Sequence, residues 1–282
     1  MNKYFIATIA AITMVGCRQH NDVNEQDESR QPDVQAVESS ESVVTERRQV
    51  PYIGDFFQIT NMSDFDIEFT QGDFNVEVEA PAAAADVLRT SFDSGIITFS
   101  QPEGDRHTIY TTNMPQSIGT IHVSCPNLKV VAVCGKGCFR STGPIHSSSL
   151  HIGLLSTADI SLDSVVCDDF FKYETSDDGS AIFSYVKAGG DLTLLASNNG
   201  HTTAYVCSDG ALLVNTGGNG QNTITAQAPT SEITAMDAST CNLTIDTDSL
   251  MVYALGESKI SLGGNIRKKE IKRSSKATVT ER

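Results

Sequence analysis

The sequence predicts an all-β protein whose main part is a parallel, right-handed β-helix, or β-solenoid, with a strand-rich cap at its N-terminal end. Three observations predict this fold class. Apolar and polar residues alternate with a period of two, and turn-forming residues interrupt the alternation at short intervals. The second half of the chain also repeats itself about every 20 residues. The length of 282 residues allows one or two domains.

The N-terminus is typical of an exported lipoprotein. Lys3 gives it a positive start, and residues 5–15 are mostly apolar but too few to cross a bilayer. Gly16-Cys17 resembles the end of the bacterial lipobox, with Met14 in place of the usual Leu. The resemblance implies a signal peptide at residues 1–16 and lipid on Cys17, which anchors a protein to a membrane without a spanning helix. An ordinary secretory signal is the alternative.

Residues 17–48 are polar, acidic and almost free of aromatic side chains. Such a segment cannot bury enough apolar surface to offset chain entropy, so it is predicted to be a disordered tether. Acidic residues soon after Cys17 resemble the surface-export signal of lipoproteins in the Bacteroidetes phylum. We therefore expect an outer-membrane lipoprotein of the cell envelope, displayed on the surface, with the periplasmic face as the alternative.

The predicted body covers residues 49–282, and its N-terminal β section covers 49–127. Within it, the apolar residues of 65–69 and 74–78 alternate on either side of Gly72, which predicts two paired, half-buried strands joined by a turn. Residues 82–88 are the one plausible helix, and 95–99 and 120–123 are further strands. We expect the strands of 50–124 to cap one open end of the solenoid.

The repeats occupy residues 128–264. Each begins with an apolar-x-apolar triplet, followed by a Gly, Asp, Asn or Ser cluster and a second, mostly apolar pair, such as Ile160 with Leu162 or Ile182 with Ser184. One such unit cannot bury its own apolar row, but stacked copies bury a continuous core. Residues 265–282 are a basic closing segment. The triplets begin at Leu128, Leu150, Phe170, Leu192, Leu212, Ile233 and Leu250.

These pieces, in this order, resemble the auto-transporter adhesin head family called the GIN domain, which is common in Bacteroidetes lipoproteins. The resemblance covers roughly 48–282 and rests on the segments Phe56–Ile59, Asp66–Gly72, Val76–Val78, Leu88–Thr90, Gly95–Phe99, Ile121–Val123, Pro126–Leu128, Gly135–Gly137, Gly218–Gly220, Ile260–Asn265 and Ser274–Val279. The turns at 177–179 and 238–240 lack the family's paired glycines, and Ile266 replaces its usual Pro. The resemblance implies a β-helix-like fold and adhesion, but no binding residues.

Six cysteines remain after Cys17: Cys125, Cys134, Cys138, Cys167, Cys207 and Cys241. Cys134 and Cys138 are spaced to bridge a tight turn by a possible disulfide, which an exported protein permits. The alternative is that most of the cysteines are small core residues in successive layers. Gly137 lies inside this turn, and a Gly137→Val change is expected to harm folding if the turn needs a positive φ there.

No residue pattern predicts catalysis, a metal site or a cofactor. Asp168-Asp169 and Asp177-Asp178 leave open an alternative function as a carbohydrate-active β-helix with paired acids, although aspartates beside turns usually bond their own backbone. With Asp246 and Asp248 they are also conceivable calcium ligands, but the known calcium-loop spacings are missing. His107, His122, His146, His151 and His201 are far apart in the sequence.

Charge excludes one class of partner. Residues 49–264 carry 8 basic and 25 acidic side chains, and a body of that charge repels phosphate backbones, so no nucleic-acid binding is expected. The absence of Trp gives little support for a sugar-stacking platform. The sequence thus predicts a non-catalytic, lipid-anchored adhesin that binds an unidentified envelope or extracellular ligand, a glycan or a protein. A purely structural envelope spacer is a further alternative.

Overall fold

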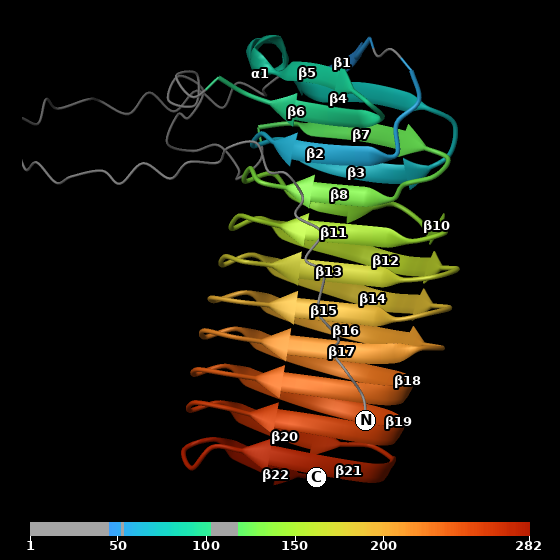
Figure 1. Cartoon of the computed structure of the whole chain (residues 1–282). Coiled ribbons are helices and arrows are strands. Elements are labelled where there is room, and N and C mark those ends of the chain that lie inside the picture. The colour runs from blue at the N-terminus through green and yellow to red at the C-terminus, as the bar shows by residue number, and fades with distance from the viewer. Residues whose placement is uncertain (1–44, 52–53, 103–117) are drawn as a thin grey trace, which may run out of the picture. The chain divides into compact units, whose positions relative to one another are not determined.

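The computed structural model describes residues 45–51, 54–102 and 118–282, and these form a parallel β-solenoid (Figure 1). The signal peptide 1–16, Cys17, the tether up to residue 44 and His107 lie outside the described residues. Each rung of the solenoid has two strand segments, which we assign to face A and face B. In Figure 1 the strands of the two faces run in opposite directions, whereas strands stacked on the same face are parallel.

Face A contains β2 (Gln58–Met62), β6 (Ile96–Ser100), β8 (Val130–Val133), β11 (Leu150–Leu154), β13 (Phe171–Thr175), β15 (Leu192–Ala196), β17 (Ala211–Thr216) and β21 (Ile266–Arg273). Face B contains β3 (Asp66–Gln71), β7 (Thr120–Cys125), β9 (Phe139–Ser141), β10 (Ile145–Ser147), β12 (Asp159–Cys167), β14 (Ser180–Ala188), β16 (His201–Ser208), β20 (Lys259–Gly263) and β22 (Thr278–Glu281). The long strands β18 (Gln221–Ala235) and β19 (Thr240–Ala254) belong to face B at their beginning and to face A at their end.

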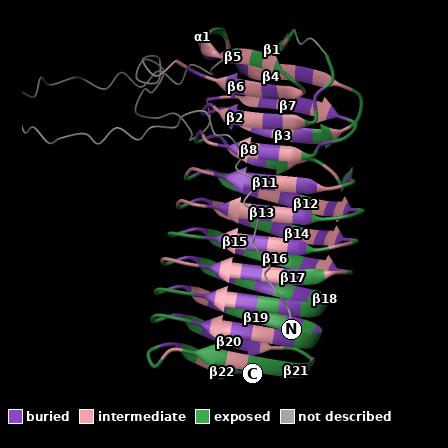
Figure 2. Cartoon of the chain, viewed as in Figure 1, coloured by how far each residue is buried: buried purple, intermediate pink, exposed green. Residues whose placement is uncertain are grey.

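The core is made of columns of buried side chains, one from each rung. Strand alternation turns every second residue inward, and the parallel register places these residues directly above one another (Figure 2). Leu150, Leu192 and Leu212 therefore belong to one column, as predicted from the repeats. The central column of face A consists of Ile97, Ile59, Val131, Ile152, Tyr173, Leu194, Val214, Ile233, Val252 and Ile271.

Two predicted repeat starts and one predicted inward-facing pair are displaced by one or two residues. Leu150 aligns with Phe171, not with Phe170, which is 41% exposed. Leu212 aligns with Ser231, not with Ile233. On β14 the buried residues are Ala181 and Phe183, and Ile182 points outward. A shift of one residue moves every side chain of a strand to the other side, so an apolar surface residue is enough to mislead a period count.

The N-terminal section forms rungs as well as a cap. The β2–β3 rung lies between the β6–β7 rung and the β8–β9 rung. After β3 the chain therefore forms most of the cap and the β6–β7 rung on one side of the β2–β3 rung, and then crosses to the other side to form the β8–β9 rung. The cap proper is β1 (Thr45–Gln49), β4 (Asn75–Pro81), the predicted helix α1 (Ala82–Val87) and β5 (Arg89–Asp93). Its strands pair antiparallel, β1 with β4, β4 with β7, and β5 with β6.

Two expectations about this section differ from the structure. The hairpin around Gly72 is wrong, because β7 lies between β3 and β4 and pairs with both. Both edges of β3 are occupied by the parallel strands β7 and β9, which leaves no edge for β4. In addition, β1 begins at Thr45, inside the segment predicted to be a tether, because it adds to the free edge of β4.

The turn from β8 to β9 requires glycine at two positions, Gly135 and Gly137. A Cβ atom on Gly135 would lie 1.9 Å from the carbonyl oxygen of Ser63, and one on Gly137 would lie 1.7 Å from that of Phe65. Both glycines are therefore required because the turn packs against the backbone of the turn above it. The condition of a positive φ is not met at Gly137, whose φ lies outside that region, so the close approach to Phe65 is what requires the glycine.

Candidate functional site

A hollow with a cavity volume of about 630 Å³ opens on the outer side of face B, where the strands approach the corner of each rung. We call it the axial groove, because it crosses the rungs of β14, β16, β18 and β19 and reaches Asn265 and Arg267 on the next rung. Its floor is a column of outward-facing side chains from these four strands. In the strand register this column is Lys187, Cys207, Gln227 and Asp246.

Two stacked tyrosines lie at the edge of the groove, one that lines it and one beside it. The ring centroids of Tyr185 and Tyr205 are 5.8 Å apart, with 26° between the ring planes. Tyr185 lines the groove, and Tyr205 is 44% exposed. The electrostatic interaction with Cys207 is the main cause that raises the pKa of Tyr205, and a phenol is a hydrogen-bond donor at neutral pH. The pair offers aromatic surface and hydroxyl groups at the same place.

The opposite wall, at the corner, is charged but nearly balanced. Lys187 lies 3.9 Å from Asp209, and Arg267 lies 2.8 Å from Asp248. Three carboxylates and two cations line the groove, since Asp246 belongs to it as well.

Asp246 and Asp248, the conceivable calcium ligands, have partners from their own chain. Asp246 Oδ1 accepts hydrogen bonds from the backbone N of Asn265 at 2.9 Å and from its Nδ2 at 3.2 Å. Asp248 is held by Arg267. Within the described ranges, no group of three or more His, Cys, Asp or Glu side chains is arranged to hold a metal ion.

The two aspartate pairs that suggested a hydrolase lie at opposite ends of β13. Asp168-Asp169 form the corner before this strand, where Asp168 N donates to the carbonyl oxygen of Ser147 at 3.0 Å. Asp177-Asp178 form the turn after it, and Asn199 Nδ2 donates to Asp178 Oδ1 at 2.7 Å. The extended strand separates the pairs by roughly 20 Å. The fold therefore does not bring them together.

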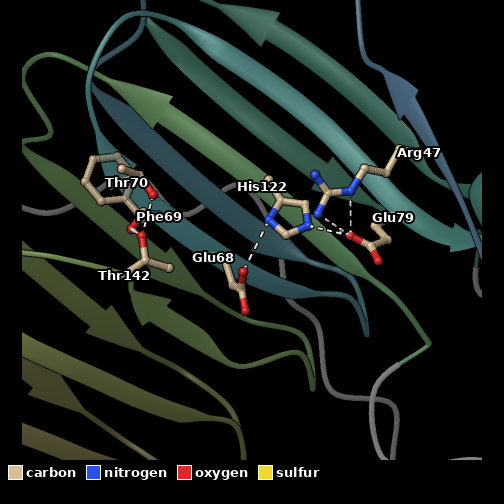
Figure 3. A network of polar contacts seen from close by, with 7 residues as sticks. All are labelled: Arg47, Glu68, Phe69, Thr70, Glu79, His122 and Thr142. Atoms are coloured by element: carbon tan, nitrogen blue, oxygen red, sulfur yellow. Dashed lines mark hydrogen bonds and ion pairs between the residues drawn. The ribbon is translucent and has the colours of Figure 1, made fainter.

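His122 lies in a polar network between the cap and the first rungs (Figure 3). Its Nδ1 is 3.2 Å from Glu68 Oε2, and its Nε2 is 3.2 Å from Glu79 Oε2. Arg47 Nε donates to the same Glu79 oxygen at 2.8 Å, and this hydrogen bond is the main cause that lowers the pKa of Glu79. The four side chains come from the adjacent strands β3, β7, β4 and β1, so the network fastens the cap.

The other described histidines do not join His122. His151 Nε2 is 2.9 Å from Glu174 Oε1 on face A, and Lys172 Nζ is 2.7 Å from Glu174 Oε2. These contacts, with that of His151 the largest, lower the pKa of Glu174 to about 2. His146, on β10, and His201, at the start of β16, are exposed. The structure thus brings no two histidines into one site among the described residues.

The cysteines are distributed between core and surface. Cys125, Cys167 and Cys241 are buried, and burial raises the pKa of each thiol, to about 11 or 12. These three fill core positions. Cys134 follows β8 and Cys138 precedes β9, at the two ends of the glycine turn, and both are partly exposed. A disulfide between them stays a prediction.

The tyrosine pair and the groove were not predicted from the sequence. The sequence has no Trp and few aromatic residues overall, and this low number gives no indication of an aromatic stack. The informative signal is the spacing of Tyr185 and Tyr205, which matches the repeat interval of the region that contains them. Residues separated by one repeat lie above one another in a solenoid, so the spacing alone indicates a surface stack.

Comparisons with known proteins agree on family and fold. Residues 55–228 match the sequence model of the family described as "Putative auto-transporter adhesin, head GIN domain". No curated protein matches the chain. Within the described residues, none of the helices has the length and apolar character needed to span a membrane.

Three solved structures resemble this one, and at their low sequence identity they show the fold alone. A putative adhesin from Parabacteroides distasonis has a TM-score of 0.69 at 13% identity, over 86% of this chain and 98% of that one. A putative adhesin from Parabacteroides merdae has a TM-score of 0.65 at 15% identity, over 84% and 96%. A putative lipid binding protein from Parabacteroides distasonis has a TM-score of 0.63 at 17% identity, over 84% and 96%.

Proposed function

The chain belongs to the GIN-domain family of auto-transporter adhesin heads, and from this premise we propose that it is a non-catalytic, lipid-anchored protein of the cell envelope that binds an envelope or extracellular ligand. The ligand is a glycan or a protein, held on the outer surface of the solenoid. The single observation that carries the proposal is the axial groove, a polar hollow of about 630 Å³ built on strands rather than on loops. Strands hold side chains in fixed positions, which reduces the entropy lost on binding.

The arrangement of the acids in the described part of the chain supports a binding role over hydrolysis. Glycoside hydrolases place two carboxyl groups within about 10 Å of each other, on either side of the bond they cleave. Here the aspartate pairs at 168–169 and 177–178 lie at opposite ends of β13. In the groove, the carboxylates of Asp246 and Asp248 are engaged by Asn265 and Arg267.

The proposed anchor is tested by replacing Cys17. The full-length chain is expressed in a Bacteroidetes host, grown with labelled palmitate, and compared with a Cys17→Ser variant. The wild type is expected to incorporate label and to remain with the outer membrane, because a diacylated cysteine holds a protein at a lipid leaflet. Digestion of intact cells with protease distinguishes surface display from the periplasmic face. Equal labelling of the two proteins would contradict the anchor.

Binding is tested on arrays of glycans and of matrix proteins, with the full-length chain kept in detergent. Reproducible binding to one class of ligand, without cleavage of it, is the expected result. Products released from a glycan by the purified chain would overturn the non-catalytic proposal. An array on which nothing binds would favour the structural spacer.

A further inference from the structure

We propose that the axial groove is a binding site for an uncharged, extended glycan chain that lies along the solenoid axis, with a sugar ring stacked at the groove edge on Tyr205, the exposed neighbour of the groove-lining Tyr185. This inference rests on the proposed binding function and names the ligand class that the groove takes. Three features of the groove support it: the aromatic pair, the repeat of the floor, and the charge of the walls.

The aromatic pair supplies the apolar contact that a sugar needs. Sugar rings have apolar faces of C–H groups that pack on aromatic rings, while their hydroxyl groups keep hydrogen bonds at the edges. The Tyr205 ring is 44% exposed and is supported from one side by Tyr185 at 5.8 Å. A ring that is already stacked loses little freedom when a ligand packs against it.

The floor of the groove repeats at an interval that suits a polymer of sugars. Lys187, Cys207, Gln227 and Asp246 follow one another at the spacing of β-strands, about 4.8 Å. An extended chain of hexoses repeats at a similar interval, so successive sugars meet successive rungs. The four floor residues include an ammonium donor, an amide that both donates and accepts, and a carboxylate acceptor. Hydroxyl groups can pair with all of them.

The walls favour an uncharged ligand. Each cation of the groove already has a carboxylate partner, Lys187 with Asp209 and Arg267 with Asp248. The remaining carboxylate, Asp246, repels anionic sugars, and the whole chain has a net charge of −15. A lipid tail is disfavoured because the lining is mainly polar. A peptide cannot add as a strand, because the backbone groups of β16 and β18 are already paired with neighbouring rungs.

The test measures binding of neutral hexose oligosaccharides of increasing length, with sulfated and uronic-acid oligosaccharides of the same lengths for comparison. The full-length chain is titrated in a calorimeter. We expect affinity to rise with length until the oligosaccharide spans the four rungs, and then to level off. We also expect anionic oligosaccharides to bind at least about 10-fold more weakly.

Two variants connect this binding to the groove. Tyr205→Ala removes the stacking surface and is expected to weaken binding about 3- to 10-fold, within the range of measured aromatic contacts. Gln227→Arg adds a long charged side chain to the middle of the floor and is expected to block binding without touching the core, since Gln227 is exposed. The matched control is Tyr253→Ala, which removes a tyrosine from face A, where it lies 5.3 Å from Lys272 Nζ, and is expected to bind like the wild type.

The outcomes separate this inference from the proposed function. Unchanged glycan binding by Tyr205→Ala and Gln227→Arg overturns the inference that the groove is the glycan-binding site but leaves the adhesin proposal in place. The same holds if the chain binds a protein or an anionic glycan on the arrays and no neutral glycan. A chain that binds nothing on either array overturns both.

Discussion

The upper rungs of the solenoid, from β2 to β14, and the lower rungs, from β15 to β22, differ in what fills their cores. In the upper rungs the core is aromatic, and the fully buried rings are those of Phe65, Phe69, Phe99, Phe139, Phe171, Tyr173 and Phe183. In the lower rungs alanines and branched aliphatic residues take their place, and no aromatic ring of these rungs is buried among the described residues. Buried polar residues occur in both halves, for example Asn61, Ser63 and Thr175 in the upper rungs and Thr202, Thr216, Asn222, Ser231, Ser239 and Ser258 in the lower ones. The backbone register continues through both halves without a break in the stack.

Rung length changes together with core composition. Along the central column of face A, the sequence interval between successive members is constant from Val131 to Leu194, and it is constant but shorter from Val214 to Ile271. A shorter rung encloses less space, and interiors are close-packed, so smaller side chains must fill it. Repeat length and core volume are therefore coupled. A sequence that shortens its repeat has to exchange aromatic residues for small ones at the same columns.

The largest expected effect comes from the tight turn in the upper rungs. Gly137→Ala places a Cβ atom 1.7 Å from the Phe65 carbonyl oxygen, and backbone on both sides leaves no room to relax. We expect a loss of more than about 4 kcal/mol of unfolding free energy, or no folding. The matched control in the lower rungs is Gly217→Ala, whose new atom would be 3.4 Å from Met236. Thermal melting of both variants checks the contrast, and equal melting temperatures would refute it.

A column shared by both halves gives the next largest effect. Phe183 of β14 aligns with Ala204 of β16, and Phe183 packs edge-on against Phe171 and Tyr173. Phe183→Ala is expected to cost about 3–5 kcal/mol, because it leaves a cavity. Ala204→Phe is expected to cost about 1–3 kcal/mol by overpacking a shorter rung. Urea denaturation measures both. If the larger residue stabilised the lower rung, the coupling between repeat length and core volume would be wrong.

The sequence allowed the repeats, the short helix and most core positions to be predicted, because these follow from local alternation and turn residues. Positions failed where an apolar residue points outward, as Ile182 does, since a period count cannot tell a surface Ile from a core Ile. The bulge between Phe183 and Val186 shifts the register at the same place. Local patterns contain no information about such a shift.

Strand partners and the groove could not be predicted from local patterns. The alternating segments at β3 and β4 resemble a hairpin, yet β7, which follows much later in the sequence, separates them. Pairing over that distance depends on which edges remain free after the rungs have stacked. The groove likewise depends on the register of four rungs, and its tyrosines become neighbours only when residue 185 is aligned with residue 205.

A smaller effect depends on pH and on the upper half alone. Glu174 has its pKa lowered from 4.5 to about 2 by His151 and Lys172, whereas the aligned residues of the next two rungs are the uncharged Leu195 and Asn215. A carboxylate with a lowered folded-state pKa contributes stability above pH 4.5 and loses it as the pH falls toward 2. Because its side chain is 31% exposed, water screens the contacts, and we expect a contribution of about 1 kcal/mol.

Glu174→Gln tests this contribution. The variant is expected to lose about 1 kcal/mol at pH 7 and only a small fraction of that at pH 2, so the two proteins converge in acid. Stability curves between pH 2 and pH 7 measure the convergence. The control is Asn215→Asp, which places a carboxylate at the aligned position two rungs below, where, among the described residues, no counterparts of His151 and Lys172 contact it. A constant difference between Glu174→Gln and wild type at all pH values would mean that the residue acts through packing.

The smallest effect is expected from the polar core of the lower rungs, and its sign is what matters. Asn222 is 1% exposed, and its Nδ2 donates to Thr216 Oγ1 at 2.5 Å, while its Oδ1 has no hydrogen-bond partner among the described residues. A buried oxygen without a partner costs about 1–3 kcal/mol. The hydrogen bond donated by the Asn222 amide, which a substitution would remove, contributes about 1 kcal/mol. The Thr216 hydroxyl keeps a contact of 3.0 Å with Cys241 Sγ in its absence.

Asn222→Val is therefore expected to raise the free energy of unfolding by up to about 1 kcal/mol. The expected gain in stability of Asn222→Val is opposite in sign to the expected loss of Phe183→Ala. The two variants therefore distinguish the halves, because the upper core depends on the volume of its side chains and the lower core tolerates a change of polarity. Urea denaturation of Asn222→Val beside Phe183→Ala provides the measurement. A destabilisation of Asn222→Val as large as that of an unsatisfied buried group, about 2 kcal/mol, would mean that the narrow rungs require the buried amide. The small core would then be selected for its hydrogen bonds as well as for its size.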